Sequence, residues 1–208
     1  IILYFQSCKK HSINKLYMIN IKFIVPSWHH LFNPFLHQPY WEMYYATNLK
    51  NKLNELKIDH KISILDTRGD PELINNVEEC DFYIYWIFKT ADAVECFDYK
   101  NKLKEKYPNS IHLAGGTHVE KSIEECEGIF DTIIVGPGEI NFAEAIKDYL
   151  ENNKKRNYTQ RWQECKFGDY PYPDRSLLPI NKIINKDLFS PYGDLNGTMV
   201  YFSRGCIY

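Results

Sequence analysis

Short apolar runs alternate with amphipathic segments along most of this chain. The runs that predict strands are Asn20–Val25, Ile58–Leu65, Asp81–Phe88, His112–Ala114 and Thr132–Val135. The segments between and after them have helical patterns, and these include Tyr40–Leu56, Asp70–Glu79, Thr90–Tyr107 and Gly138–Glu151. Strands that alternate with helices are typical of a parallel sheet with right-handed crossovers. The pattern therefore predicts an α/β fold, a flavodoxin-like doubly wound sheet of five parallel strands.

Two of the predicted strands end in glycine turns, Gly115-Gly116-Thr117-His118 and Gly136-Pro137-Gly138-Glu139. Glycine allows a sharp turn and a close approach to the backbone, and the start of the following helix offers free N–H groups to a ligand. At the carboxyl ends of parallel strands, such turns predict a binding rim. They are also compatible with plain structural turns, with His118 as a cap and Glu139 serving the helix dipole. Neither turn matches a dinucleotide or P-loop fingerprint, which disfavours nicotinamide cofactors and nucleoside triphosphates.

The loop after the first strand, Pro26–Pro39, is long, aromatic and rich in histidine. Loops of this length are usually functional or mobile. His29, His30 and His37 show no spacing typical of a structural zinc site, so exposed or lid histidines are favoured over a metal centre. After the second strand, Asp66 and Arg68 are either a cofactor-facing pair or part of a turn.

Composition and charge limit the classes of molecule that the chain is expected to bind. The net charge of −2 gives no case for nucleic acid or an anionic membrane. No apolar run approaches the roughly 18 residues of a membrane span, and no secretory signal is visible. Six cysteines without a C-x-x-C spacing indicate a reducing, cytoplasmic setting. The 16 tyrosines and 12 phenylalanines favour a ligand-facing or interdomain surface in addition to a core.

The pattern changes at both ends of the α/β region, which we place at residues 18–152. Residues 1–17 include Leu3–Ser7, which resembles the remnant of an engineered protease site, so they are taken as tag remnant and linker. Residues 153–197 form an interdomain linker, stiffened by prolines at Tyr170–Arg175. Residues 198–208 predict a new strand, Thr198–Phe202, that leads to Cys206. We expect this strand to open a second domain that is mostly absent.

Four stretches carry a resemblance to a known family, in the same order as in that family: LAGGTHVE (Leu113–Glu120), VGPGE (Val135–Glu139), YPYPDRSLLP (Tyr170–Pro179) and TMVYFSRGCIY (Thr198–Tyr208). Together they resemble the branch of radical S-adenosylmethionine (SAM) enzymes that contains a cobalamin-binding domain. The resemblance covers about Met18–Tyr208. It identifies the first two stretches with rim loops of that domain, the third with the interdomain linker, and the fourth with the first barrel strand.

The resemblance implies a radical enzyme. In the family, three cysteines of a C-x-x-x-C-x-x-C motif hold a [4Fe–4S] cluster, and the fourth iron binds SAM, whose reductive cleavage gives a 5′-deoxyadenosyl radical. Cys206 matches the first cysteine, as a metal ligand. The other two fall beyond Tyr208, so this chain alone is expected to be inactive. Many members use methylcobalamin to methylate a carbon or phosphorus centre. The parent is then expected to act on an unknown small molecule or peptide, with flavodoxin or ferredoxin as electron donor.

The corrinoid implied by the family would lack a lower histidine ligand. Classical cobalamin domains carry D-x-H-x-x-G after the first strand, whereas this loop begins Pro26-Ser-Trp-His-His-Leu31. The expectation is a base-off, His-off cobalamin. Trp28, Phe32 and Trp86 would cover its lower face, or they are ordinary core and lid residues. The residues expected to contact this cofactor are Trp28, Asp66, Arg68, Trp86 and the eight residues of the two glycine turns.

Three hypotheses remain open at this point. The parent is a radical SAM methyltransferase that binds cobalamin, or a radical SAM enzyme whose α/β domain no longer binds it and is vestigial or holds substrate. In the third hypothesis, the chain is a flavodoxin-like binding domain without catalysis.

Overall fold

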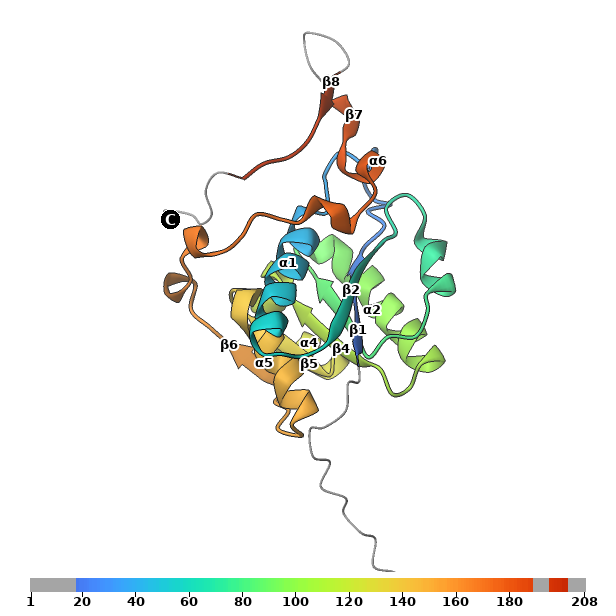
Figure 1. The fold of residues 1–208 in the computed structure, drawn as a ribbon. Helices are drawn as coiled ribbons and strands as arrows, with labels where there is room; N and C mark the ends of the chain where they lie inside the picture. The colour runs from blue at the N-terminus through green and yellow to red at the C-terminus, as the bar shows by residue number, and fades with distance from the viewer. Residues whose placement is uncertain (1–17, 189–194, 202–208) are drawn as a thin grey trace, which may run out of the picture.

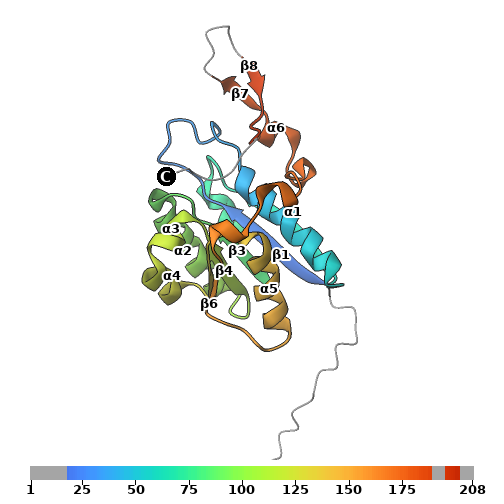
Figure 2. The ribbon, with the colours of Figure 1, turned by 90° about the vertical axis from the view of Figure 1, so that its left-hand side faces the viewer.

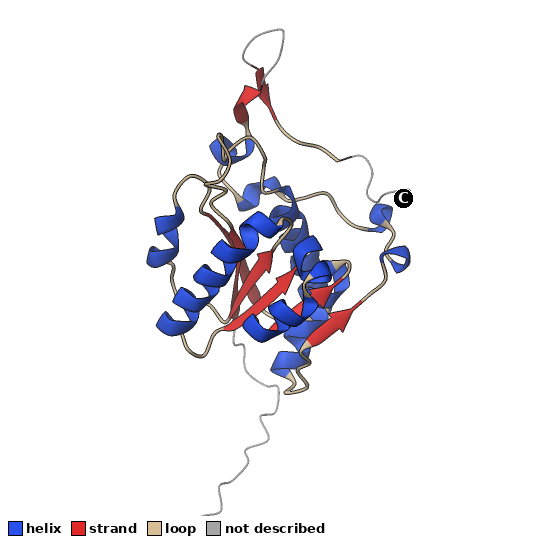
Figure 3. Cartoon of the chain, turned by 180° about the vertical axis from the view of Figure 1, so that it is seen from behind, coloured by secondary structure: helices blue, strands red, loops and turns tan. Residues whose placement is uncertain are grey.

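A computed structural model of the chain describes residues 18–188 and 195–201. Its centre is a twisted parallel sheet covered by helices on both faces (Figures 1 and 3). The strands are β1 (Ile19–Val25), β2 (His60–Asp66), β3 (Phe82–Trp86), β4 (Ile111–Gly115), β5 (Thr132–Val135) and β6 (Asn157–Thr159). Their order is β2-β1-β3-β4-β5-β6. The predicted α/β class and parallel sheet are confirmed, but the predicted count of five strands is wrong.

The sixth strand, β6, lies where the sequence predicts a solvated linker. It pairs in parallel with β5, with Ile133 opposite Asn157 and Val135 opposite Thr159. Three residues are too few to show a periodic pattern, so tertiary pairing decides this strand. Tyr158 anchors it, because its ring is buried and its hydroxyl donates to Asp148 Oδ2 at 2.7 Å.

The helices form two layers, one on each face of the sheet (Figure 2). On one face lie α1 (Tyr40–Glu55) and α5 (Gly138–Leu150). On the other lie the 3₁₀ helix η1 (Pro71–Asn76), α2 (Thr90–Lys106), α3 (Thr117–Lys121) and α4 (Ile123–Ile129). Strand β3 shows why the core divides in this way, since side chains alternate between the faces of a strand. Ile84 and Trp86 join the α1/α5 core, whereas Tyr83 and Tyr85 join the core under α2.

A histidine side chain lies fully buried in the α2 core. His112 stacks between Tyr83 and Tyr85, with ring centroids 5.2 and 6.0 Å away. Its two ring nitrogens lie 3.1 Å from the Tyr85 hydroxyl and 2.9 Å from Ser110 Oγ. Burial lowers the pKa of His112 to about 3, so the imidazole is neutral and satisfied inside the core.

The segment after β6 crosses the α1 face toward the carboxyl ends of the strands (Figure 1). It contains η2 (Trp162–Glu164), η3 (Phe167–Asp169), η4 (Arg175–Leu177) and α6 (Ile180–Ile183), followed by the antiparallel pair β7 (Asn185–Leu188) and β8 (Leu195–Gly197). Leu178 and Ile183 fasten it by packing on Met43 of α1.

The strand predicted at Thr198–Phe202 is not confirmed, since residues 198–201 follow β8 without strand pairing and Phe202 lies outside the described residues. Arg175 holds this segment instead, by donating to Thr198 Oγ1 and to the Met199 carbonyl. The predicted metal ligand Cys206 lies outside the described residues.

Candidate functional site at the carboxyl edge

The carboxyl ends of the parallel strands meet at one edge of the sheet. Between β1 and β3 the chain leaves in opposite directions, to α1 on one face and to α2 on the other. Ligands of open α/β sheets bind at such a switch point. The candidate site is therefore built from the loops and helix starts at this edge.

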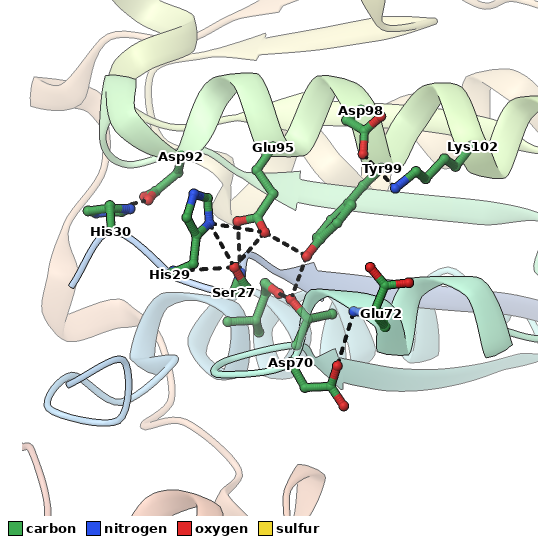
Figure 4. A network of polar contacts seen from close by, with 12 residues as sticks. Ser27, His29, His30, Asp70, Glu72, Asp92, Glu95, Asp98, Tyr99 and Lys102 are labelled. Atoms are coloured by element: carbon green, nitrogen blue, oxygen red, sulfur yellow. Dashed lines mark hydrogen bonds and ion pairs between the residues drawn. The ribbon is translucent and has the colours of Figure 1, made fainter. Parts of the chain in front are cut away.

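Hydrogen bonds to helix α2 fix the beginning of the loop after β1 (Figure 4). The buried Ser27 donates its N–H to Glu95 Oε2 at 2.9 Å and its hydroxyl to Glu95 Oε1 at 2.5 Å. Tyr99, one turn further along α2, donates to the same Oε1 at 2.7 Å. Glu95 therefore holds the loop start against the helix.

Two histidines of this loop lie beside carboxylates of α2 (Figure 4). His29 Nδ1 is 3.6 Å from Glu95 Oε1, and His30 Nε2 is 3.8 Å from Asp92 Oδ1. Ser27 and His29 contact the same carboxylate and Ser27 is buried, so this is not a nucleophile–base–acid relay. Within residues 18–188 and 195–201, no group of three or more His, Cys, Asp or Glu is placed to hold a metal ion.

Trp28 has an unusual backbone in the middle of this segment. Its φ of 52° lies in the left-handed region, which a bulky side chain rarely adopts. Its ring packs between two cations, with Arg68 Cζ 5.8 Å and Lys89 Nζ 6.0 Å from the ring centroid. Such strain persists only when surrounding contacts over-determine it. The ring of Trp28, a predicted cofactor residue, is therefore packed against side chains from the loop after β2 and from the start of α2.

Asp66 and Arg68 form a buried pair with each other. Arg68 donates from Nε and Nη2 to the two Asp66 oxygens, each at 2.8 Å. It also donates to the carbonyls of His37 and Lys182, each at 2.6 Å. The Arg68 side chain is 0% exposed. The pair therefore ties the loop after β1 and the linker to β2, and it does not face an open edge.

The glycines of the predicted rim lie against atoms of the chain itself. A Cβ on Gly115 would come 3.0 Å from Trp86 and 3.2 Å from Phe142, and one on Gly138 would come 2.6 Å from Phe142. Gly116 and Gly136 have φ values of 112° and 95°, and a Cβ there would meet the carbonyl oxygens of Ile87 and Gln160 at 2.4 and 2.0 Å. These glycines allow close packing within the chain.

The remaining rim residues divide between the edge surface and the interior. Thr117 is exposed at the start of α3, whereas Pro137 is buried before α5. His118 is buried, with Nδ1 3.3 Å from Thr90 Oγ1 and Nε2 3.5 Å from Glu125 Oε2. Glu139 is also buried and accepts from the Tyr44 hydroxyl at 3.0 Å.

An aromatic cluster on α1 is the main feature that sequence reasoning missed. Its members are Tyr40, Trp41, Tyr44 and Tyr45, which pack with Trp86 of β3, Phe142 of α5 and Tyr201. The closest pair is Tyr45 and Trp86, with centroids 4.0 Å apart. The run YWEMYY, with aromatic residues at spacings of one and four in a helix, was the available signal.

Buried polar groups near this cluster have unused hydrogen-bonding capacity. Gln38 Nε2, Trp86 Nε1 and Asn141 Nδ2 are buried donors, and no described residue accepts from them. All three are donors, so a ligand that satisfied them would present oxygen or nitrogen acceptors. Glu42, in the first turn of α1, is also buried, and burial raises its pKa to about 8.

Residues 198–201 are held directly on this edge. Arg175 donates to Thr198, to the Met199 carbonyl at 2.7 Å and to Gln38 Oε1 at 3.5 Å. The Tyr201 ring lies with its centroid 4.4 Å from Tyr40 and 5.4 Å from Trp41. The final described segment therefore packs on the aromatic cluster of α1.

Comparison with known proteins adds no relative, since no family model matches the chain and no curated protein matches it. In the described part of the chain, no helix is both long and apolar enough to cross a membrane.

Proposed function

We propose that this chain is the N-terminal α/β domain of a radical SAM enzyme, a methyltransferase, and that the carboxyl edge of its sheet faces the catalytic domain. One structural observation carries the proposal. Residues 198–201 lead toward Cys206, which matches the first cluster cysteine, and they are held on this edge by Arg175 and by the contact of Tyr201 with the α1 aromatic cluster.

Covalent geometry limits how far the cluster motif can lie from this edge. Cys206 follows Tyr201 by five positions in the chain. An extended chain spans at most about 3.6 Å per residue, so the two are within about 18 Å in any conformation. A cluster that used Cys206 would therefore form close to the edge, where substrate and a second cofactor could meet.

The edge fits a corrinoid in one respect. A corrinoid carries amide carbonyls and a phosphate, which are acceptors, and Gln38, Trp86 and Asn141 offer buried donors without acceptors among the described residues. These three side chains would hold the group, and Tyr45 packed on Trp86 would keep water from that side. When bound, methylcobalamin supplies a methyl group. The parent would draw electrons from a flavodoxin or ferredoxin and act on a small molecule or peptide.

The glycine turns do not fit that role, and they favour a second candidate function. Trp86, Phe142 and backbone carbonyls fill the space that a ligand would need beside Gly115, Gly116 and Gly136. In this second candidate, the domain belongs to a radical SAM enzyme but no longer holds cobalamin, and its edge instead forms a wall of the substrate site.

Cobalamin binding separates the two candidates. The purified chain is incubated with excess hydroxocobalamin and passed through a gel-filtration column. In the first candidate, visible absorbance co-elutes with protein, and Asn141→Leu, which keeps the volume but removes the donor, weakens retention. Asn101→Leu, on the surface of α2, is the matched control. Absence of co-eluting cobalamin at any ligand excess would eliminate the first candidate.

The enzyme class is tested independently of cobalamin. Cysteines at the fourth and seventh positions after Cys206 in the parent gene are the expected result, and the full-length protein should then bind a reducible iron–sulfur cluster. Their absence would overturn both radical candidates and leave the non-catalytic binding domain.

A further inference from the structure

Rings of tyrosine and tryptophan form a continuous series from the last described segment into the domain core. Successive centroids are 4.4 Å apart for Tyr201–Tyr40, 6.2 Å for Tyr40–Tyr44, 5.2 Å for Tyr44–Tyr45 and 4.0 Å for Tyr45–Trp86. Tyr201 is half-buried at one end, and the four other rings are at most 5% exposed. Tyrosine and tryptophan are the two side chains most readily oxidised by one electron without loss of structure, and rings at such separations exchange electrons rapidly.

The middle member of the series has a proton acceptor in place. The Tyr44 hydroxyl donates to Glu139 Oε1 at 3.0 Å, and both residues are 1% exposed. A tyrosine that loses an electron becomes a strong acid, and it is stabilised as a neutral radical only when its proton can leave. Glu139 lies in the first turn of α5, and its Oε1 is the atom to which the hydroxyl proton of Tyr44 would move.

Packing alone does not require hydroxyls at these positions. Phenylalanine or leucine would fill the interface between α1 and α5 without a buried hydroxyl that needs a partner. A second buried tyrosine provides a contrast, because Tyr99 also donates to a carboxylate, Glu95, at 2.7 Å. Tyr99 belongs to the core under α2, on the other face of the sheet, and so has a proton acceptor but does not belong to the ring series.

We propose that Tyr44 is a redox-active tyrosine and that the ring series Tyr201–Tyr40–Tyr44 carries an oxidising equivalent to it from the carboxyl edge. The physiological oxidant rests on the proposed function: it is an organic radical that escapes the catalytic domain next to this edge. The series then protects the site by moving the oxidising equivalent to Tyr44, which is buried and has a proton acceptor.

The reaction balances in two steps. The escaping radical takes a hydrogen atom from the Tyr201 hydroxyl, which gives a closed-shell product and a Tyr201 radical. An electron from Tyr44 then passes through Tyr40 to Tyr201, which regains a proton from solvent. The Tyr44 proton moves to the Glu139 carboxylate, leaving a neutral tyrosyl radical and a glutamic acid. To complete the cycle, a cellular thiol returns the electron through the series, releases its proton to solvent and becomes a thiyl radical, while Glu139 returns the proton to Tyr44.

Photo-oxidation tests the series without an iron–sulfur cluster or SAM. The purified chain is illuminated with a ruthenium(II) tris-bipyridine sensitiser and persulfate, and the radical is followed by transient absorption and by electron paramagnetic resonance after freezing. Because the oxidant is external, this test can fail while the proposed function holds, and the reverse is also true.

Three variants decide the outcome. Tyr44→Phe keeps the ring but should remove the long-lived tyrosyl signal, whereas Glu139→Gln should shorten its lifetime because the proton acceptor is lost. Tyr99→Phe, the matched control on the other face, should leave the signal unchanged. Circular dichroism establishes folding, and ring-deuterated tyrosine narrows the hyperfine pattern of a tyrosyl radical in the unmodified chain. A full signal in Tyr44→Phe, or its loss in Tyr99→Phe, would overturn the proposal.

Discussion

Replacing Arg68 with methionine should strongly destabilise the domain, because Arg68 joins three parts of the chain within the core. The change removes the charge and retains much of the volume. Asp66 is 7% exposed in the wild type, and after the change Lys182 Nζ, at 3.9 Å, is the one cation that the described residues still place beside it. The carbonyls of His37 and Lys182 also lose a donor. Breaking one side of a buried ion pair costs about 3–5 kcal/mol.

This loss is large enough to measure in two ways. For a domain of this size, about 1 kcal/mol shifts Tm by about 2–4 °C, so Arg68→Met should lower Tm by about 10 °C. Urea unfolding followed by circular dichroism gives the free energy directly. Lys102→Met is the matched control, because the exposed Lys102–Asp98 pair on α2 should contribute less than about 0.5 kcal/mol.

A double variant tests whether the buried charge is the cause. Asp66→Asn together with Arg68→Met leaves no unpaired charge, so it should be more stable than Arg68→Met alone. If Arg68→Met unfolds within about 0.5 kcal/mol of the wild type, Arg68 is not a structural centre of the edge. The prediction that Arg68 faces a cofactor would then be favoured.

Three further predictions concern protonation and the glycine turns. The pKa of His112 is lowered from 6.5 to about 3 by burial, so its contribution to stability is complete above pH 6.5 and is lost as the pH falls toward 3. His112→Gln should flatten this part of a pH–stability curve, which otherwise drops by about 5 kcal/mol. Burial raises the pKa of Glu42 from 4.5 to about 8, so the opposite sign applies and stability is lost as the pH rises through that interval. Glu42→Gln should therefore gain stability over the wild type progressively from pH 4.5 to 8, and a constant difference would contradict the burial of a protonated carboxyl. Gly136→Ala should lower Tm by several degrees and increase hydrogen exchange in β6, because the added Cβ would overlap the carbonyl oxygen of Gln160. Gly128→Ala in α4 is the control: its Cβ would meet nothing within 4 Å, so it should be neutral or stabilising by about 0.5–1 kcal/mol.

The sheet could be predicted from the sequence because its signals are local. An almost wholly apolar run such as Asp81–Phe88 and a glycine after a short strand each point to one structure. The start of η1 also has a local signal, because Asp70 directly before Pro71 is a typical N-cap, and its carboxylate accepts from the Glu72 N–H at 3.1 Å. β6 could not be predicted, since its three residues are a strand only because β5 has an open edge beside them.

The arrangement of the candidate site could be predicted only in part. Parallel strands bring Asp66, Trp86 and the glycine turns to one edge, as the pattern indicates. What fills that edge depends on side chains from elements far apart in sequence. Nothing near Gly115 in the sequence shows that Phe142 takes the adjacent space. Likewise, nothing near Arg68 shows that the backbone carbonyl of Lys182 accepts a hydrogen bond from it. Residues on the inward face of α1 were overlooked because an aromatic helix face is usually core.

Two arginine contacts that involve the linker converge on one place, the end of the loop before α1. Arg68 binds the carbonyl of His37, and Arg175 binds the side chain of the next residue, Gln38. Each arginine also binds the chain on one side of the β7–β8 pair. Arg68 donates to the carbonyl of Lys182, which precedes β7, and Arg175 donates to Thr198, which follows β8. Because hydrogen bonds fix both ends of the pair to adjacent residues, a displacement of residues 198–201 is transmitted to residues 37–38. From there it reaches the loop that Glu95 and Trp28 hold against α2. A displacement at residue 201 would therefore reach the switch point of the sheet.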